Sequence, residues 1–73
     1  MSELRWQCRR GMRELDVLLV RYLDSRYAAA ESEERLAFRK ILQLSDPQLV
    51  EYLLRGETSG EPTVDKVLAD LRG

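Results

Sequence analysis

Residues 12–23 read MRELDVLLVRYL, and apolar side chains recur every three or four positions along them. This spacing is that of one face of an α-helix, which turns once in about 3.6 residues. We therefore predict an amphipathic helix whose apolar stripe faces the core of the protein. The stripe consists of Met12, Leu15, Leu19, Tyr22 and Leu23.

A second, shorter helix is predicted upstream of this one. Ser2 is a suitable N-cap for a helix that carries Leu4, Trp6 and Cys8. Gly11 suits the end of such a helix or a bend in it, because glycine adopts backbone angles that other residues avoid. We therefore expect two helices that meet at Gly11.

A third helix is expected to begin near Ser32, where Glu33 and Glu34 complement the positive end of the helix dipole. In Asp46-Pro47 we expect a new helix start, because Asp is a good cap and Pro is favoured at the first helical position. The third helix should bury one side formed by Leu36, Ala37, Ile41 and Leu44, with Phe38 and Leu42 beside it.

The remaining chain predicts two more helices separated by one loop. Gly56 closes the fourth helix, and residues 57–62 have the composition of a turn. The fourth helix carries Leu49, Val50, Leu53 and Leu54, and the last carries Val64, Val67, Leu68 and Leu71 at i, i+3, i+4 and i+7. No stretch alternates long enough for a sheet, so we predict an all-α fold, a small antiparallel bundle of about five short helices.

The size and composition of the chain limit its function. Its 73 residues suffice for a single domain, 1–73, with a modest core. The chain is 44% apolar and 34% charged, which is typical of a folded protein, and its net charge of −1 does not favour nucleic acid as a partner. We also expect the chain to be monomeric.

The sequence indicates a cytoplasmic protein. Cys8 is the single cysteine and has no partner for an internal disulfide, and we expect no signal peptide because the first residues lack its pattern. The longest apolar run, residues 17–20, is far shorter than the roughly 20 residues that a membrane-spanning helix requires. We therefore expect no membrane insertion.

The side chains that most enzymes use are missing. The chain has no histidine, which is the commonest general base and nitrogen ligand of metals. Without that base, Cys8 is better explained as a small buried apolar residue than as a nucleophile. No Gly-rich phosphate loop or dinucleotide motif occurs. We expect no enzymatic activity, no metal and no cofactor bound by this chain, so that any cofactor belongs to a partner.

Residues 5–16, RWQCRRGMRELD, are the most distinctive segment. Arg and Trp are enriched in the energetic centres of protein interfaces, and glycine lets a partner backbone approach closely. If helical geometry continues through this segment, Arg10 and Glu14 lie on one face beside Gly11 and form a contact patch. The alternative is that Gly11 is a plain helix cap, Arg10 and Glu14 a surface ion pair, and Trp6 a core anchor. The residues alone leave both interpretations open.

This segment resembles the SdhE-like succinate dehydrogenase assembly factors, whose signature is Arg-Gly-x-x-Glu. The signature is matched by Arg10, Gly11 and Glu14. A wider pattern is matched in unbroken register by Trp6, Cys8, Arg9, Arg10, Gly11, Met12, Glu14, Leu15 and Asp16. The resemblance continues through Phe38, Asp46-Pro47, Leu53 and Gly56, and departs from the family in Tyr22, Tyr52 and a short C-terminal tail.

The resemblance implies a five-helix bacterial protein that binds the flavoprotein subunit of succinate dehydrogenase, and also of fumarate reductase. It implies that the protein promotes covalent attachment of FAD to a histidine of that subunit. By the same resemblance, Arg10, Gly11 and Glu14 would contact the flavoprotein, with Arg9 and Asp16 beside them and Trp6 as either a contact or a core residue.

Two other functions remain open from the sequence. An antitoxin-like or nucleic-acid-binding regulator would use the arginine cluster on phosphates, but two acids interrupt the cluster and no recognition helix is evident. The cluster consists of Arg5, Arg9, Arg10 and Arg13, and the acids are Glu14 and Asp16. A helical subunit of another complex is the third possibility.

Overall fold

The computed structural model describes residues 3–73, in which helices are joined by short turns and one longer loop. It contains five α-helices and two short helical segments of other types, so the prediction of an all-α fold with about five helices is confirmed. In chain order the elements are α1 (Glu3–Gln7), α2 (Arg13–Ser25), η1 (Tyr27–Ala29), α3 (Ser32–Leu42), α4 (Asp46–Leu49), η2 (Val50–Leu54) and α5 (Pro62–Arg72).

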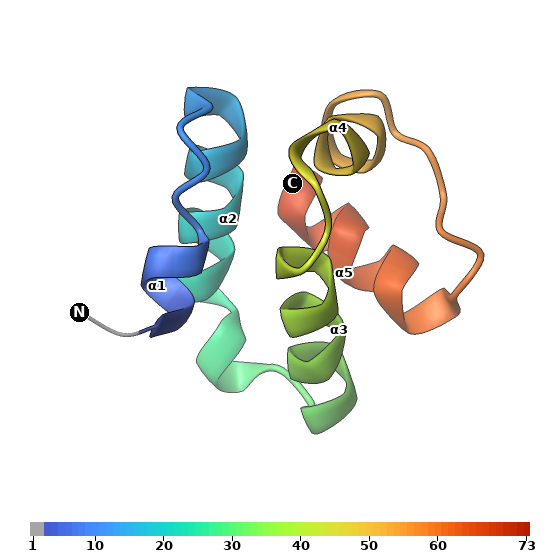
Figure 1. The fold of residues 1–73 in the computed structure, drawn as a ribbon. Coiled ribbons are helices and arrows are strands. Elements are labelled where there is room, and N and C mark those ends of the chain that lie inside the picture. Colours follow the sequence, from blue (N-terminus) through green and yellow to red (C-terminus); the bar gives the residue numbers. More distant parts are fainter. Residues whose placement is uncertain (1–2) are drawn as a thin grey trace.

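The helices α2 and α3 run in opposite directions and are joined through η1 at one end of the molecule (Figure 1). Helix α5 packs against both of them and against η2, so it is the element that closes the bundle. The short α1 folds back along α2, where Arg5 forms an ion pair with Asp24. This arrangement leaves the outer face of α2 uncovered by α3 and α5.

The core consists of apolar side chains only, within the residues that the structure describes. At its centre the rings of Tyr22 and Phe38 are stacked, with 4.7 Å between their centroids. Burying each side chain of this size stabilises the fold by about 1.5–3 kcal/mol. The predicted apolar face of the last helix is confirmed, because all four of its members are buried: Val64, Val67, Leu68 and Leu71.

The starts of α3 and α4 are set by capping side chains. Helix α3 begins at Ser32 as predicted, and the N–H of Glu31 donates a hydrogen bond to Glu34 Oε1 over 3.0 Å. At α4 the predicted cap was wrong. Ser45, not Asp46, caps the helix, because Ser45 has an extended backbone and its hydroxyl accepts from the N–H of Gln48. Asp46 is the first helical residue.

The structure differs from the sequence interpretation in the exposure of two leucines, in the position of Cys8 and in the shape of the fourth helix. Leu36 and Leu54 are 59% and 47% exposed, because the neighbouring residues of α3 and η2 already cover the core. Helix α1 ends at Gln7, so Cys8 is buried as expected but lies just beyond the helix. The predicted cap Ser2 lies outside the described residues. The fourth helix also widens after Leu49 into the π-helical segment η2.

Candidate functional site

The chain between α1 and α2, residues 8–12, forms a non-helical turn that we call the Gly11 turn. Cys8 anchors its beginning, since the side chain is fully buried and the N–H donates to the carbonyl of Leu4 over 3.2 Å. Gly11 has a φ of 81°, a backbone conformation that L side chains rarely adopt. Helical geometry therefore does not continue from α1 into α2.

Gly11 lies at the surface with open space around its α-carbon. It is exposed, and a Cβ built on it would meet no atom within 4 Å beyond its two neighbours in the chain. Glycine is thus required here by the backbone angle and not by crowding inside the protein. The open space leaves bare backbone accessible to a partner.

Arg10 points away from this surface and into the joint between helices. Its side chain is only 18% exposed, and its guanidinium donates to the carbonyl oxygens of Leu42 and Leu44 at the end of α3. The distance from Nη1 to Leu44 O is 3.2 Å, and Nη1 lies 3.6 Å from Asp46 Oδ1. Arg10 and Glu14 do not form the ion pair that the sequence left open; Arg10 pairs with Asp46 instead.

The two acids of the segment have different surroundings. Asp16 lies in the first turn of α2 and is partly buried, and its Oδ1 accepts a hydrogen bond from the backbone N–H of Arg10 over 2.7 Å. Glu14 lies in the same helical turn and is exposed. Asp16 therefore holds the Gly11 turn against α2, while the carboxylate of Glu14 is available to solvent.

Arg9 and Trp6 are both exposed, Trp6 by 67%. The interpretation of Trp6 as a core anchor is therefore wrong, because α1 turns this side chain outward. Along the outer face of α2, a shallow groove of about 560 Å³ begins at Arg9. Its other lining residues are Asp16, Val17, Val20 and Arg21.

The residues that hold Arg10 could not be recognised from the sequence. Asp46 was recognised only as part of a helix start, and nothing in the local pattern connects it with Arg10, 36 positions away. The main-chain carbonyls of Leu42 and Leu44 carry no side-chain signature at all. The end of α3 was the available clue, because the last carbonyls of a helix need donors from elsewhere.

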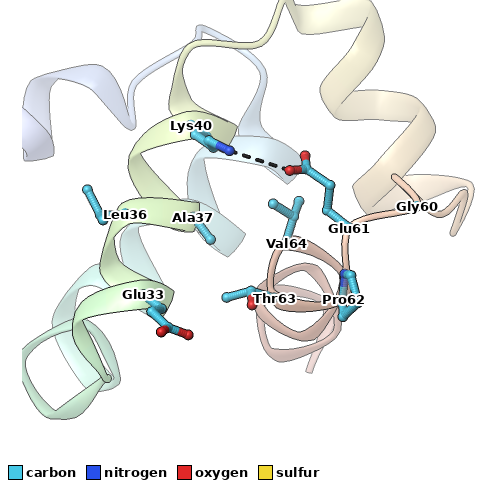
Figure 2. A pocket seen from close by; sticks show the side chains of 9 residues that line it. All are labelled: Glu33, Leu36, Ala37, Lys40, Gly60, Glu61, Pro62, Thr63 and Val64. Carbon is cyan, nitrogen blue, oxygen red and sulfur yellow. Dashed lines mark hydrogen bonds and ion pairs between the residues drawn. The ribbon is translucent and has the colours of Figure 1, made fainter.

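A second groove, of about 440 Å³, lies between α3 and the start of α5 (Figure 2). Leu36 and Ala37 line its α3 side, and Pro62 and Val64 line the other. The ion pair of Lys40 with Glu61 crosses it at 3.4 Å, between two exposed side chains. This groove lies on a different part of the molecule from the segment that bears the family signature.

The electrostatics of the chain do not point to a reactive group. Burial raises the pKa of the Cys8 thiol to about 11, so the thiol stays protonated at neutral pH. Residues 3–73 contain no cluster of Cys, Asp and Glu arranged to hold a metal ion. In the same range, no helix combines the length and apolar character of a membrane span.

Comparisons with known proteins agree on one family. The family model described as "Flavinator of succinate dehydrogenase" matches residues 2–73. The "FAD assembly factor SdhE" of Shewanella oneidensis is 33% identical over 73 residues, which is 100% of this chain and 89% of that protein. The protein of that name from Coxiella burnetii is 33% identical over 97% of this chain and 87% of its own length. The one from Xylella fastidiosa is 38% identical over 99% of this chain and 74% of its own length.

No solved structure matches the chain significantly. The family match covers nearly the whole sequence, and it includes both the Gly11 turn and the α3–α4 corner to which Arg10 is bonded. The chain therefore belongs to the family of flavinators of succinate dehydrogenase.

Proposed function

We propose that this chain is an assembly factor that binds the flavoprotein subunit of succinate dehydrogenase and promotes covalent attachment of FAD to it. The observation that carries the proposal is the exposed Gly11 turn in a chain of this family. The backbone at Gly11 is open, and the side chain of Glu14, three positions later, is exposed. The related proteins are named FAD assembly factors, which supports the same function here.

The proposed contact surface consists of the exposed residues of the signature segment: Arg9, Gly11 and Glu14, with Trp6 on α1. An exposed guanidinium, an exposed carboxylate and bare backbone within one short segment suit a partner that offers complementary charges and main-chain hydrogen bonds. Asp16 and Arg10 belong to the same segment, but the Asp16 carboxylate and both Nη atoms of Arg10 form hydrogen bonds within the chain.

The proposed mechanism is positioning. Binding holds the flavoprotein in a conformation in which the FAD methyl group and the acceptor histidine are aligned, and bond formation then takes place within the partner. In this proposal FAD is bound by the flavoprotein and not by this chain. The fully buried, protonated Cys8 supports the proposal that the chemistry takes place in the partner, because the one thiol of this chain is not available as a nucleophile.

The antitoxin-like or nucleic-acid-binding alternative is weakened by the pairing of its arginines. Arg5 pairs with Asp24, and Arg10 is turned toward the end of α3. Of the cluster, Arg9 and Arg13 remain exposed, next to Glu14. Two exposed arginines beside a carboxylate make a poor phosphate-binding surface, since phosphate contacts require several uncompensated positive charges.

The direct test uses the flavoprotein subunit purified from cells that lack this protein. The subunit is incubated with FAD, with and without the chain, then denatured on a gel and examined by ultraviolet fluorescence, which detects only covalently attached flavin. We expect fluorescence to increase with the chain present, and the flavoprotein subunit of fumarate reductase should be tested in parallel. Equal fluorescence with and without the chain would show that the proposed function is wrong.

A further inference from the structure

Arg10 connects the Gly11 turn with a distant corner of the fold. Its Nη1 and Nη2 donate to the carbonyls of Leu44 and Leu42, and Nη1 faces the Asp46 carboxylate at 3.6 Å. The side chain is 18% exposed, and its Nε is buried without an acceptor among the described residues. A guanidinium held in this way has little freedom to turn toward a partner.

The corner between α3 and α4 suits a cation for general reasons. The last carbonyls of a helix lack donors within the helix, and the C-terminal end of the helix dipole is negative. A guanidinium presents five N–H donors in a fixed plane, so it can donate to two separate carbonyls from two different nitrogens, whereas an ammonium has all its donors on one nitrogen. The carboxylate of Asp46, the first residue of α4, adds an opposite charge beside Nη1, the nitrogen that also donates to Leu44.

The main chain of Arg10 is held as firmly as its side chain. Its N–H donates to Asp16 Oδ1 over 2.7 Å, on the first turn of α2. Arg10 is thus bonded to α2 through its backbone and to the α3–α4 corner through its side chain. Gly11 follows directly, and a glycine with open space around it has no contacts of its own to keep it in place.

We propose that Arg10 is a positioning residue, which fixes the Gly11 turn in its binding conformation by fastening it to the α3–α4 corner, and that Asp46 acts in the same way through Arg10. The inference rests on the proposed function for the identity of the partner, the flavoprotein subunit. It differs from the direct contact that the family resemblance implied for Arg10. Its physical basis is that a surface ordered before binding loses less conformational entropy when it binds.

The test compares Arg10→Ala, Arg10→Lys, Asp46→Asn and the double variant Arg10→Ala with Asp46→Asn. The control Lys40→Ala removes an exposed ion pair from the same helix α3. Two quantities are measured for each: the heteronuclear NOE of the Gly11 amide, which reports motion of the turn, and the Kd for the FAD-free flavoprotein subunit of succinate dehydrogenase. Thermal unfolding confirms that each variant is folded.

We expect Arg10→Ala to lower the Gly11 NOE and to weaken binding about tenfold or more, since a turn that is mobile in the free protein must be ordered when the partner binds. Asp46→Asn should weaken binding about threefold, with the NOE lowered less. The double variant should bind no more weakly than Arg10→Ala alone, because Asp46 acts through Arg10. The Kd and the Gly11 NOE of Arg10→Lys should lie between those of Arg10→Ala and the unaltered chain. Lys40→Ala should have the same Kd and NOE as the unaltered chain.

Two results would overturn the positioning role. One is a Gly11 amide that stays as rigid in Arg10→Ala as in the unaltered chain. The other is an Asp46→Asn variant with unaltered Kd beside an Arg10→Ala variant that has lost binding, since this would show Arg10 touching the partner directly. If the unaltered chain itself fails to bind the flavoprotein, the proposed function is wrong, and the NOE measurements show separately whether Arg10 holds the turn.

Discussion

The carboxylate of Asp16 accepts a hydrogen bond from the backbone N–H of Arg10, with 2.7 Å between the two atoms. This bond joins the first turn of α2 to the turn that precedes it, and it substitutes for a side-chain cap, because Met12 at the N-cap position makes none. In the wider pattern shared with the family, Asp16 lies two positions after Glu14, but the two acids have different surroundings in the structure. Asp16 orders the turn, and Glu14 faces solvent.

Replacing Asp16 with Asn should lower the free energy of unfolding by about 1 kcal/mol, because a neutral acceptor of the same size makes a weaker hydrogen bond than a carboxylate. Urea titration followed by circular dichroism measures this difference. The matched control is Glu14→Gln, which removes one negative charge from an exposed side chain in the same helical turn. Equal losses in the two variants would mean that the charge at the helix start, and not the bond to Arg10, is responsible.

Substitutions at Gly11 should separate backbone strain from partner contact. Gly11→Ala and Gly11→Gln both place a side chain at a φ of 81°, and each should cost about 1–2 kcal/mol of stability. The added side chain meets open space in the free protein, so both variants should fold. Covalent flavin on the partner should nevertheless fall much further with Gln than with Ala, because only Gln projects far into the proposed contact surface.

The control for this pair is Gly56→Gln, at a glycine with a φ of 75° that is equally open but lies after η2. It should lose similar stability and retain flavinylation. If Gly11→Gln and Gly56→Gln flavinylate the partner equally well, Gly11 is not at the contact.

Cys8 should be unreactive in the folded protein. Burial raises the pKa of its thiol to about 11, which lowers the thiolate fraction near pH 8 by about 100-fold relative to an ordinary thiol, and the side chain is also shielded from solvent. Labelling with a chromogenic disulfide reagent should be slow in buffer and fast in denaturant. Immediate labelling of the folded chain at pH 8 would contradict the buried position.

Acid should destabilise the loop before α5. The N–H and hydroxyl of Ser59 donate to Asp65 Oδ1 over 2.7 and 2.8 Å, and these bonds hold the pKa of the Asp65 carboxyl below its ordinary value of about 3.9. A carboxyl with a lowered pKa in the folded state contributes stability above the unfolded pKa, and this contribution is lost as pH falls through the folded pKa.

The midpoint temperature of thermal unfolding, measured from pH 6 to pH 2, should therefore decrease once the pH is lower than about 4. The fall should be smaller in Asp65→Asn, which has no proton to bind at that site. Glu57→Gln serves as the control, because it removes a carboxylate from the same exposed loop. A pH profile of Asp65→Asn that coincides with that of the unaltered chain would show that these hydrogen bonds contribute nothing to the acid sensitivity.

Much of the fold was predictable from local spacing. The apolar stripe of α2 and the four buried residues of α5 follow a helical period, which can be recognised from residues that are close together in the sequence. Helix starts were predicted to within one residue at α3 and α4, where capping side chains act over three positions. Leu36 was assigned to the wrong face, because its neighbours Ala37 and Phe38 already fill the space against α5 and α2.

The signature segment was recognisable from its residue types, but what its members do was not. The spacing of Arg10 and Glu14 suggested one helical face, whereas the positive φ of Gly11 breaks the helix and sends the two side chains to different surroundings. Arg10 then bonds to carbonyls at the end of α3, which lie more than thirty positions away along the chain. Short-range chemistry determines where helices begin and which face is apolar, because those interactions act within one turn. Which polar groups meet across the protein depends on how the finished helices pack, and only the folded chain brings Arg10 to Asp46.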